Sequence, residues 1–186
     1  VYSSVIVAGQ ASRALDDPIS RFPPLTECVQ IFDQCYDPDN TTNLDLSYNG
    51  ITGPIPTEIG QLAALTNLDL RYNYNIIGTI PTEIGQLTAL TNLDLQYNSI
   101  IGTMPTEIGQ LTALQYLELN DNNQINGTIP KELGRLAALK TLDLDTNKIV
   151  GPIPTEIGQL TALEELDLDS NKVDGPIPTE IGQLKK

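Results

Sequence analysis

The side chains best suited to chemistry in this chain of 186 residues are carboxylates, since it contains 24 Asp and Glu and no His. Paired carboxylates can move protons or help to hold a metal ion. Without His, however, the Ser–His and Cys–His nucleophilic arrangements and most zinc sites are excluded. The sequence also lacks the glycine-rich phosphate-binding and dinucleotide-binding motifs. We therefore expect no enzymatic activity, no metal site and no cofactor.

Many of these carboxylates occur at a regular spacing, which favours an architectural role. An acidic residue stands between two leucines at Asp45, Asp69, Asp94, Glu118, Asp143 and Asp167. Because like charges in line repel one another, this row could attract a cation or a basic partner. The alternative is that these are solvated charges of a repeated surface. We favour this alternative over a bound metal.

The charge balance limits the classes of partner. The formal net charge is −14, so nucleic acid and anionic membrane surfaces are unfavourable partners. A protein partner, in particular a basic one, and a neutral glycan both stay open. No uninterrupted run of 18 apolar residues occurs, so we expect no membrane span.

The elements that must position the acidic residues are short strands and turns in a unit that is repeated six times. Each L-[DE]-L triplet is followed by an Asn, an aliphatic residue, a Gly and the run [PT]-[IM]-P-x-E-[IL]-G-x-L. Leucines with a period of two share one face of a strand, and stacked copies bury them at a spacing of about 4.8 Å. We expect the asparagines to bind backbone groups of the turns and the next glycines to permit a bend. The prolines precede a short helical turn, which Gly60 and its equivalents would end or tighten.

This pattern resembles the leucine-rich-repeat family, in particular the plant-type class with the consensus L-x-x-L-x-x-L-x-L-x-x-N-x-L-x-G-x-I-P-x-x-[IL]-G. Residues 142–165, LDLDTNKIVGPIPTEIGQLTALEE, match it almost position for position, and the resemblance covers about residues 41–184. It implies an α/β solenoid, a right-handed curved array with a parallel β-sheet on the concave side and short 3-10 turns on the convex side. A second short strand near the G-x-I-P segment is also implied. The class includes receptor ectodomains and polygalacturonase inhibitors.

Two parts of the chain are distinguished by the repeat. Residues 1–40 lack it and are predicted to form an N-terminal cap, whereas residues 41–186 hold six repeats, the last of them incomplete. Cys28 and Cys35 resemble the cysteines of the family's cap segment C-x-W-x-G-V-x-C, which implies a disulfide, although Gln30 and Phe32 replace its Trp and Gly. Two buried free thiols are the alternative. The sixth repeat shows no capping segment, so we expect either that the chain is a fragment of a longer protein or that this end packs into a larger assembly.

Outward-facing strand residues form columns on the concave face, where we expect a protein or glycan to bind. Tyr48, Tyr72 and Tyr97 form one file with Tyr116 nearby, and exposed Tyr contributes strongly to binding. Alternatively, the stacked rings only stabilise the sheet. The later strands are acidic, which suits a basic partner. The predicted binding residues are Tyr48, Tyr72, Tyr97, Tyr116, Arg71, Asn67, Asn92, Asp69, Asp94, Asp145 and Asp169.

A non-catalytic binding module is therefore the predicted function, and two alternatives stay open. One is a scaffold subunit of a larger assembly. The other is ice binding, because Thr recurs at positions 57, 82, 106, 155 and 179, although these lie at convex turns and Lys131 interrupts the file. Asn40 and Asn126 begin N-x-T sequons and are predicted glycosylation sites. We expect an extracytoplasmic location, secreted or at the cell surface, with an organelle lumen as the alternative.

Overall fold

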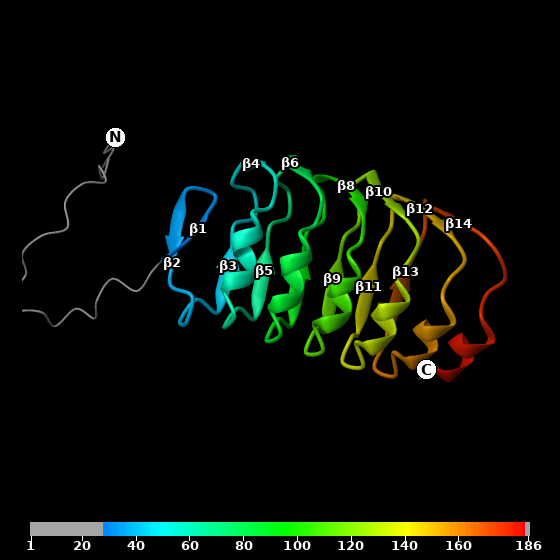
Figure 1. Ribbon diagram of the computed structural model, residues 1–186. Helices are drawn as coiled ribbons and strands as arrows, with labels where there is room; N and C mark the ends of the chain where they lie inside the picture. Colours follow the sequence, from blue (N-terminus) through cyan, green and yellow to red (C-terminus); the bar gives the residue numbers. More distant parts are fainter. Residues whose placement is uncertain (1–27, 185–186) are drawn as a thin grey trace, which may run out of the picture.

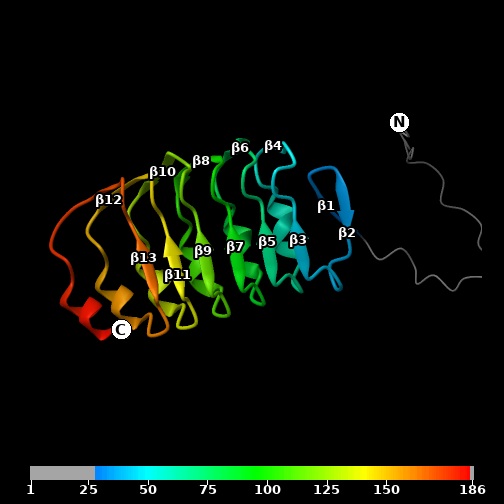
Figure 2. The same ribbon diagram turned by 180° about the vertical axis from the view of Figure 1, so that it is seen from behind.

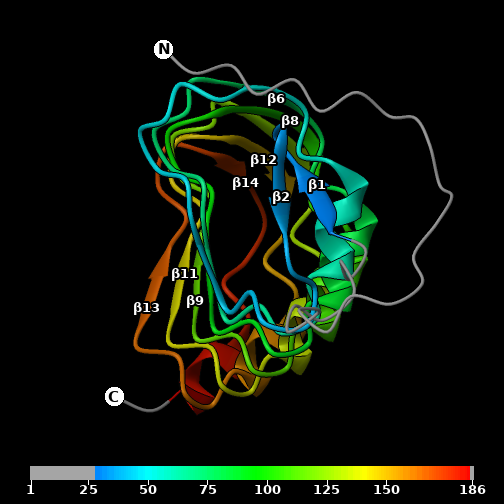
Figure 3. The same cartoon turned by 90° about the vertical axis from the view of Figure 1, so that its left-hand side faces the viewer.

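The computed structural model describes residues 28–184, which form a solenoid of stacked coils (Figure 1). Each coil contributes a strand to each of two parallel six-stranded sheets and adds one 3-10 helix. Seen along the axis, one of the sheets and the 3-10 helices lie on opposite sides of the coil (Figure 3). The predicted α/β solenoid is confirmed, with this sheet on the concave side and the 3-10 helices on the convex side.

The elements recur in the same order in every coil, and Figure 2 shows the strands of the concave sheet side by side. The concave sheet consists of β3 (Asn43–Asp45), β5 (Asn67–Asp69), β7 (Asn92–Asp94), β9 (Tyr116–Glu118), β11 (Thr141–Asp143) and β13 (Glu165–Asp167). The second sheet, called the lateral sheet, consists of β4 (Thr52–Gly53), β6 (Asn75–Gly78), β8 (Ser99–Thr103), β10 (Gln124–Gly127), β12 (Lys148–Gly151) and β14 (Lys172–Val173). The 3-10 helices are η1 (Thr57–Gln61), η2 (Thr82–Gln86), η3 (Thr106–Gln110), η4 (Lys131–Arg135), η5 (Thr155–Gln159) and η6 (Thr179–Gln183).

Leucine files fill the core. Leu44 pairs in register with Leu68, and Leu68 with Leu93, so equivalent side chains lie on top of one another from coil to coil. These leucines are buried, whereas the residues on either side of them point to the concave surface. The alternation explains why each strand needs neighbours, because one coil alone would leave its leucines in water.

The two sets of repeated glycines have different physical reasons. Gly53 has a φ of +91°, in the left-handed region, so the predicted bend is confirmed. Gly60 does not end the helical turn, the first of the two roles predicted for it, because it lies within η1 and has no positive φ. A Cβ at Gly60 would stand 2.6 Å from the carbonyl oxygen of Glu83 in the next coil. This glycine therefore allows the 3-10 helices of adjacent coils to pack closely.

An asparagine ladder runs along the core, as predicted. The Asn98 side chain donates from Nδ2 to the carbonyl oxygens of Leu70 and Leu95, and its Oδ1 accepts from the Asn73 backbone N–H at 3.0 Å. Each such amide thus joins two coils. Asn49, in the first coil, departs from the prediction: it is exposed and donates to the Ser47 carbonyl oxygen of its own coil. No preceding repeat offers it a carbonyl in the described part of the chain.

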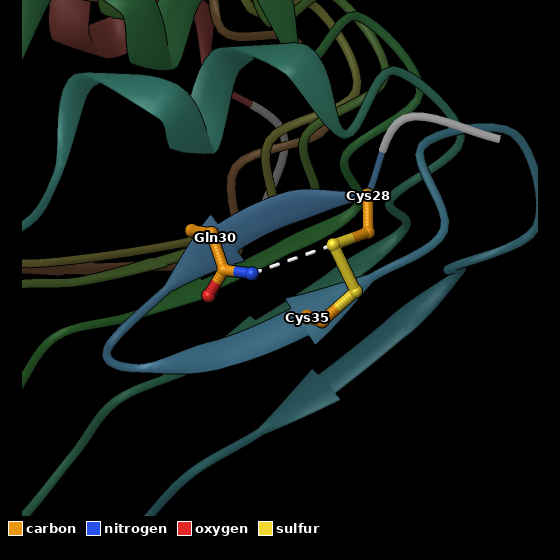
Figure 4. The surroundings of a disulfide bond; sticks show 3 residues. All are labelled: Cys28, Gln30 and Cys35. Atoms are coloured by element: carbon orange, nitrogen blue, oxygen red, sulfur yellow. Dashed lines mark hydrogen bonds between the residues drawn. A yellow bond between two sulfur atoms is a disulfide. The ribbon is translucent and has the colours of Figure 1, made fainter. Parts of the chain in front are cut away.

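A short hairpin covers the first coil. Strands β1 (Val29–Ile31) and β2 (Gln34–Tyr36) pair antiparallel, and Val29 and Ile31 are buried against the core. The Cys28–Cys35 disulfide joins the two strands and is confirmed, with the Gln30 amide 3.4 Å from the Cys28 sulfur (Figure 4). The rest of the predicted cap, residues 1–27, lies outside the described residues. No helix within residues 28–184 is long and apolar enough to cross a membrane.

Candidate functional site

The concave face presents a regular grid of side chains, here called the concave grid. Backbone hydrogen bonds between coils continue beyond the strands, from Leu46 N–H to Asp69 and from Tyr48 N–H to Arg71, so four positions of each coil line up in columns. The first column is Asn43, Asn67, Asn92, Tyr116, Thr141 and Glu165. The second column is Asp45, Asp69, Asp94, Glu118, Asp143 and Asp167. The third column is Ser47, Arg71, Gln96, Asn120, Asp145 and Asp169. The fourth column is Tyr48, Tyr72, Tyr97, Asp121, Thr146 and Ser170.

The fourth column begins with a stack of three tyrosine rings. The ring centroids of Tyr48 and Tyr72 lie 4.3 Å apart, and those of Tyr72 and Tyr97 also lie 4.3 Å apart. All three residues have a φ between 54° and 58°, and this left-handed backbone turns the rings in parallel. Tyr74, in the next turn, meets Tyr72 edge-on at 6.2 Å. Stacking occupies the inner ring faces, but Tyr48 stays 66% exposed, so the stack has an accessible aromatic surface.

The first column differs between the early and late coils. In the early coils, the Asn67 amide donates to Asn43 Oδ1 and the Asn92 amide to Asn67 Oδ1, each at 2.7 Å. Tyr116, on the fourth strand of the concave sheet, occupies this column and does not join the tyrosine stack of the fourth column. The ammonium group of Lys140 lies 5.9 Å from the centroid of its ring. The predicted binding residues Asn67, Asn92 and Tyr116 therefore lie in the same column of the concave grid.

The second column is not a simple row of solvated charges. Asp69 and Asp94 are only 8% and 3% exposed, so the expectation of solvated carboxylates is wrong for these two. Arg71 covers both: its Nε lies 3.3 Å from Asp69 Oδ2 and its Nη1 3.4 Å from Asp94 Oδ2. Gln96 donates from Nε2 to Asp94 Oδ2 at 3.1 Å and to Glu118 Oε2 at 2.8 Å. Donors of the third column thus hold the buried carboxylates of the second.

The carboxylates at the centre of this column are also hard to ionise. Burial, followed by the negative charges of Asp94 and Asp143, raises the pKa of Glu118 to about 7. Burial raises the pKa of Asp94, against the hydrogen bonds from Gln96, and burial raises the pKa of Asp143 as well. The centre of the grid therefore carries protons at a pH at which ordinary carboxyl groups have lost theirs.

The late coils lack such donors. Asp145 and Asp169 occupy the third column where the earlier coils have Arg71 and Gln96. In coils four to six the grid holds seven acidic residues and no basic one, against three acidic residues and Arg71 in coils one to three. No group of three or more His, Cys, Asp and Glu in residues 28–184 is arranged to hold a metal ion. This half of the grid is a surface of hydrogen-bond acceptors.

The remaining candidate residues lie away from the concave grid. The predicted glycosylation sites Asn40 and Asn126 are exposed, Asn40 before the first coil and Asn126 on strand β10 of the lateral sheet. The repeated threonines begin the 3-10 helices on the convex side and are exposed, and the Thr82 hydroxyl donates to the neighbouring Glu83 at 3.2 Å. Neither set joins the aromatic and acidic side chains of the concave face.

Repeated strand–turn–helix coils, leucine files and an asparagine ladder define the class of protein: a plant-type repeat solenoid with a concave surface open to ligands. Residues 43–151 match the family description "leucine-rich repeat region", and residues 162–184 match the single leucine-rich repeat. The chain belongs to the leucine-rich-repeat family. No curated protein matches its sequence significantly.

Solved structures of plant proteins share the fold. The leucine-rich-repeat ectodomain of the membrane receptor kinase GASSHO1/SCHENGEN3 from Arabidopsis thaliana, in complex with CASPARIAN STRIP INTEGRITY FACTOR 2, is 42% identical with a TM-score of 0.73. That match covers 76% of this chain and 17% of the ectodomain. PEPR1–AtPEP1 is 38% identical with a TM-score of 0.74, and the match covers 78% of this chain and 21% of PEPR1. A plant ice-binding protein is 29% identical with a TM-score of 0.67, covering 92% of this chain and 53% of that one.

Proposed function

We propose that this chain is a non-catalytic recognition module whose concave grid binds an extracytoplasmic polypeptide. The observation that carries the proposal is the composition of the grid. Its tyrosine stack and its acidic half consist of side chains that the leucine core does not require, on the face that the fold leaves open. Exposed aromatic groups beside charged groups are typical of binding surfaces.

The similar structures support this proposal without naming the partner. GASSHO1/SCHENGEN3 is described in complex with CASPARIAN STRIP INTEGRITY FACTOR 2, and PEPR1 with AtPEP1. This chain spans 17% and 21% of those proteins, so their partners do not transfer to it. The disulfide of the hairpin and the ectodomain relatives favour an oxidising, secreted or cell-surface location. The excess of acceptors in the late coils favours a basic partner, and a glycan is the alternative ligand.

Affinity capture with matched variants tests the proposal. The immobilised full chain would be compared with a concave variant carrying Tyr48→Ala, Tyr72→Ala and Tyr97→Ala, on extracellular fluid from the source. A convex control would carry Thr82→Ala, Thr106→Ala and Thr155→Ala, and circular dichroism would establish that all three chains are folded. We expect the concave variant to lose at least about tenfold of the captured partner and the convex control to keep it. Equal capture by the two folded variants would overturn the proposal.

Ice binding is a second candidate function, because the plant ice-binding protein matches over 92% of this chain. The exposed threonines of the 3-10 helices are the side chains that would contact ice. Each of Thr57, Thr82 and Thr106 bonds to the carboxylate that follows it, so charges interleave with the hydroxyl groups. The interruption by Lys131 adds a further charge, and we therefore rank this candidate lower. Thermal hysteresis of the purified chain, absent from the convex control, would establish it.

A scaffold role in a larger assembly is a third candidate. The observation in its favour is apolar surface on the sixth coil, where Ile177 is 74% exposed and Leu166 and Leu168 are only half-buried. Sedimentation of the purified chain tests it. A concentration-dependent assembly that Ile177→Asp dissolves would support this role, whereas a monomer at all concentrations would argue against self-assembly through this surface.

A further inference from the structure

Two hydrogen-bond acceptors in the acidic half of the concave grid are buried without a partner. Among the buried side-chain atoms of residues 28–184, Asn120 Oδ1 and Asp145 Oδ1 receive no hydrogen bond. Asn120 is only 9% exposed, and the two residues are neighbours in the third column. Buried acceptors are nearly always satisfied in folded proteins, so this pair requires an explanation.

The orientation of the Asn120 amide is fixed by its neighbour. Its Nδ2 faces Asp121 Oδ2 at 3.4 Å, and a carboxylate can only accept a hydrogen bond. The oxygen therefore points the other way, where it receives no hydrogen bond. Asp145 is similarly committed on one side, because its Oδ2 accepts from the Thr146 hydroxyl at 2.9 Å. What both residues lack is a donor from outside the coil.

The carboxylates beside them lie in the same arrangement as those around Arg71. In the early coils the guanidinium group of Arg71 reaches Asp69 and Asp94, which are neighbours in the second column. Glu118 and Asp143 are the next such neighbours with no cation of their own, and they flank Asn120 and Asp145. The repeat thus places a pair of neighbouring acids in coils two and three and a corresponding pair in coils four and five. Only the early pair has a guanidinium group of this chain beside it.

We propose that Glu118, Asn120, Asp143 and Asp145, here called the acceptor cluster, receive an arginine side chain of the polypeptide partner. This inference rests on the proposed function, because it assigns part of the concave grid to one residue of the bound chain. A guanidinium group carries five donors in a plane and can serve several spread acceptors at once, whereas an ammonium group is a compact point charge. The cluster would thereby acquire from the ligand what Arg71 supplies within the chain.

An NMR titration of the 15N-labelled full chain tests the proposal without the natural partner. The probes are N-acetyl-arginine methylamide, the lysine analogue and the citrulline analogue, which keeps the shape of arginine but has no charge. We expect saturable shifts of the backbone amides of residues 118–121 and 143–146 with arginine, weaker shifts with lysine and none with citrulline. Equal shifts with arginine and lysine, spread over the acidic surface, would overturn the proposal.

Matched variants separate the cluster from the general negative charge. Asp145→Asn removes one charge from the cluster, and Asp174→Asn removes the same charge from an exposed position outside the concave grid. We expect Asp145→Asn to weaken arginine binding about tenfold, because it removes a charged acceptor, and Asp174→Asn to change it by less than about twofold. Dispersed amide spectra would establish that both variants fold. Equal weakening by the two variants would contradict a specific site.

The outcomes also separate this inference from the proposed function. If the tyrosine variant loses the captured partner while arginine fails to shift the cluster, the inference is wrong and the recognition function stands. If arginine binds the cluster but the tyrosine variant and Asp145→Asn both capture the partner normally, the captured partner does not use the cluster, and both the proposed function and the assignment of the cluster to its partner fail.

Discussion

The two halves of the concave grid have the same backbone and opposite chemistry. In coils one to three, Arg71 and Gln96 bind the carboxylates, the asparagines of the first column bind one another, and three tyrosines stack. In coils five and six, carboxylates replace the donors of the third column, and Asn120 and Asp145 keep free buried oxygens. The comparison shows that the repeat determines where the side chains of the grid lie. It does not determine whether their polar atoms have hydrogen-bond partners. The early half holds its buried carboxylates with donors of this chain, whereas the late half keeps buried acceptors that the proposed arginine of the partner would fill.

The asparagine ladder runs through both halves, so we expect its substitutions to cost the same stability in either half. This cost is the largest effect that we predict. Asn98 lies in the early half and Asn147 in the late half, and each donates to three carbonyl oxygens and accepts one backbone N–H. We expect either change to Ala to lower the free energy of unfolding by about 3 kcal/mol, since several buried groups lose their partner. Urea denaturation measures this, and Asn49→Ala is the exposed control, with less than about 0.5 kcal/mol. A large difference in the free energy of unfolding between Asn98→Ala and Asn147→Ala would contradict a scaffold that is the same in both halves.

Arg71→Ala should convert the early half toward the late one. Asp94, 3% exposed, would lose its cation and keep only Gln96, so we expect a loss of about 2 kcal/mol of stability. The arginine is itself partly exposed, which places the effect below that of a fully buried ion pair. Arg135→Ala on the convex side is the control, because no ion pair of Arg135 occurs in residues 28–184, and it should leave the urea midpoint unchanged. Equal midpoints for both variants would contradict a stabilising role of Arg71.

The boundary between the halves should be sensitive to pH through Glu118. Its pKa is raised to about 7 in the folded chain from an ordinary value of 4.5, so the folded state retains a proton that the unfolded state releases. The contribution of Glu118 to the free energy of unfolding is therefore highest below pH 4.5, and it falls as pH rises to 7 and beyond. After allowance for its partial exposure we expect a loss of about 1–2 kcal/mol between pH 5 and pH 8.

The matched variant for this prediction is Glu118→Gln. The chain carries a net charge of −14, which also repels itself more strongly at high pH, so only the difference between the two chains reports on Glu118. Thermal midpoints at pH 5 and pH 8 should converge more closely in Glu118→Gln than in the parent chain. An identical pH dependence of both chains would argue against the raised pKa.

The tyrosine stack should have the smallest effect on stability. Tyr72 stacks on both Tyr48 and Tyr97, and each aromatic pair contributes about 0.5–1.5 kcal/mol when favourably placed. Because these rings are partly in water, we expect Tyr72→Ala to cost about 1 kcal/mol and Tyr74→Ala, which loses one edge contact, less than about 0.5 kcal/mol. Urea denaturation of both variants distinguishes them. No cost for Tyr72→Ala would mean that the stack serves only binding.

Much of the scaffold could be predicted from the sequence because the repeat shows it six times. The leucine files, the asparagine ladder and the bend at Gly53 follow from residue type and spacing. The Cys28–Cys35 disulfide follows from the resemblance to the family's cap segment. What could not be predicted depends on contacts between coils. The close approach of Glu83 to Gly60 is one example, since it gives the glycine a role that no local turn signal reveals.

The residue types of the site could be predicted from the sequence, but their backbone conformation, burial and contacts could not. The sequence places Tyr48, Tyr72 and Tyr97 in one file, yet their left-handed backbone and parallel rings emerge only in the structure. Burial of Asp94 follows from Arg71 and Gln96 in adjacent coils, and it could have been suspected from donors two positions after the acids. Asn120 escaped the sequence analysis altogether. Its only sequence signal is that it stands in the third column between Gln96 and Asp145.

Radical footprinting of the chain with its captured partner tests most directly whether the concave face is the binding surface. Tyr48 and Tyr116 mark the concave grid with exposed side chains, and Ile77 and Ile101 mark the lateral sheet with comparable exposure. Our account predicts that the partner lowers the oxidation of Tyr48 and Tyr116 severalfold and leaves that of Ile77 and Ile101 unchanged. Protection of the isoleucines with unchanged oxidation of both tyrosines would contradict it.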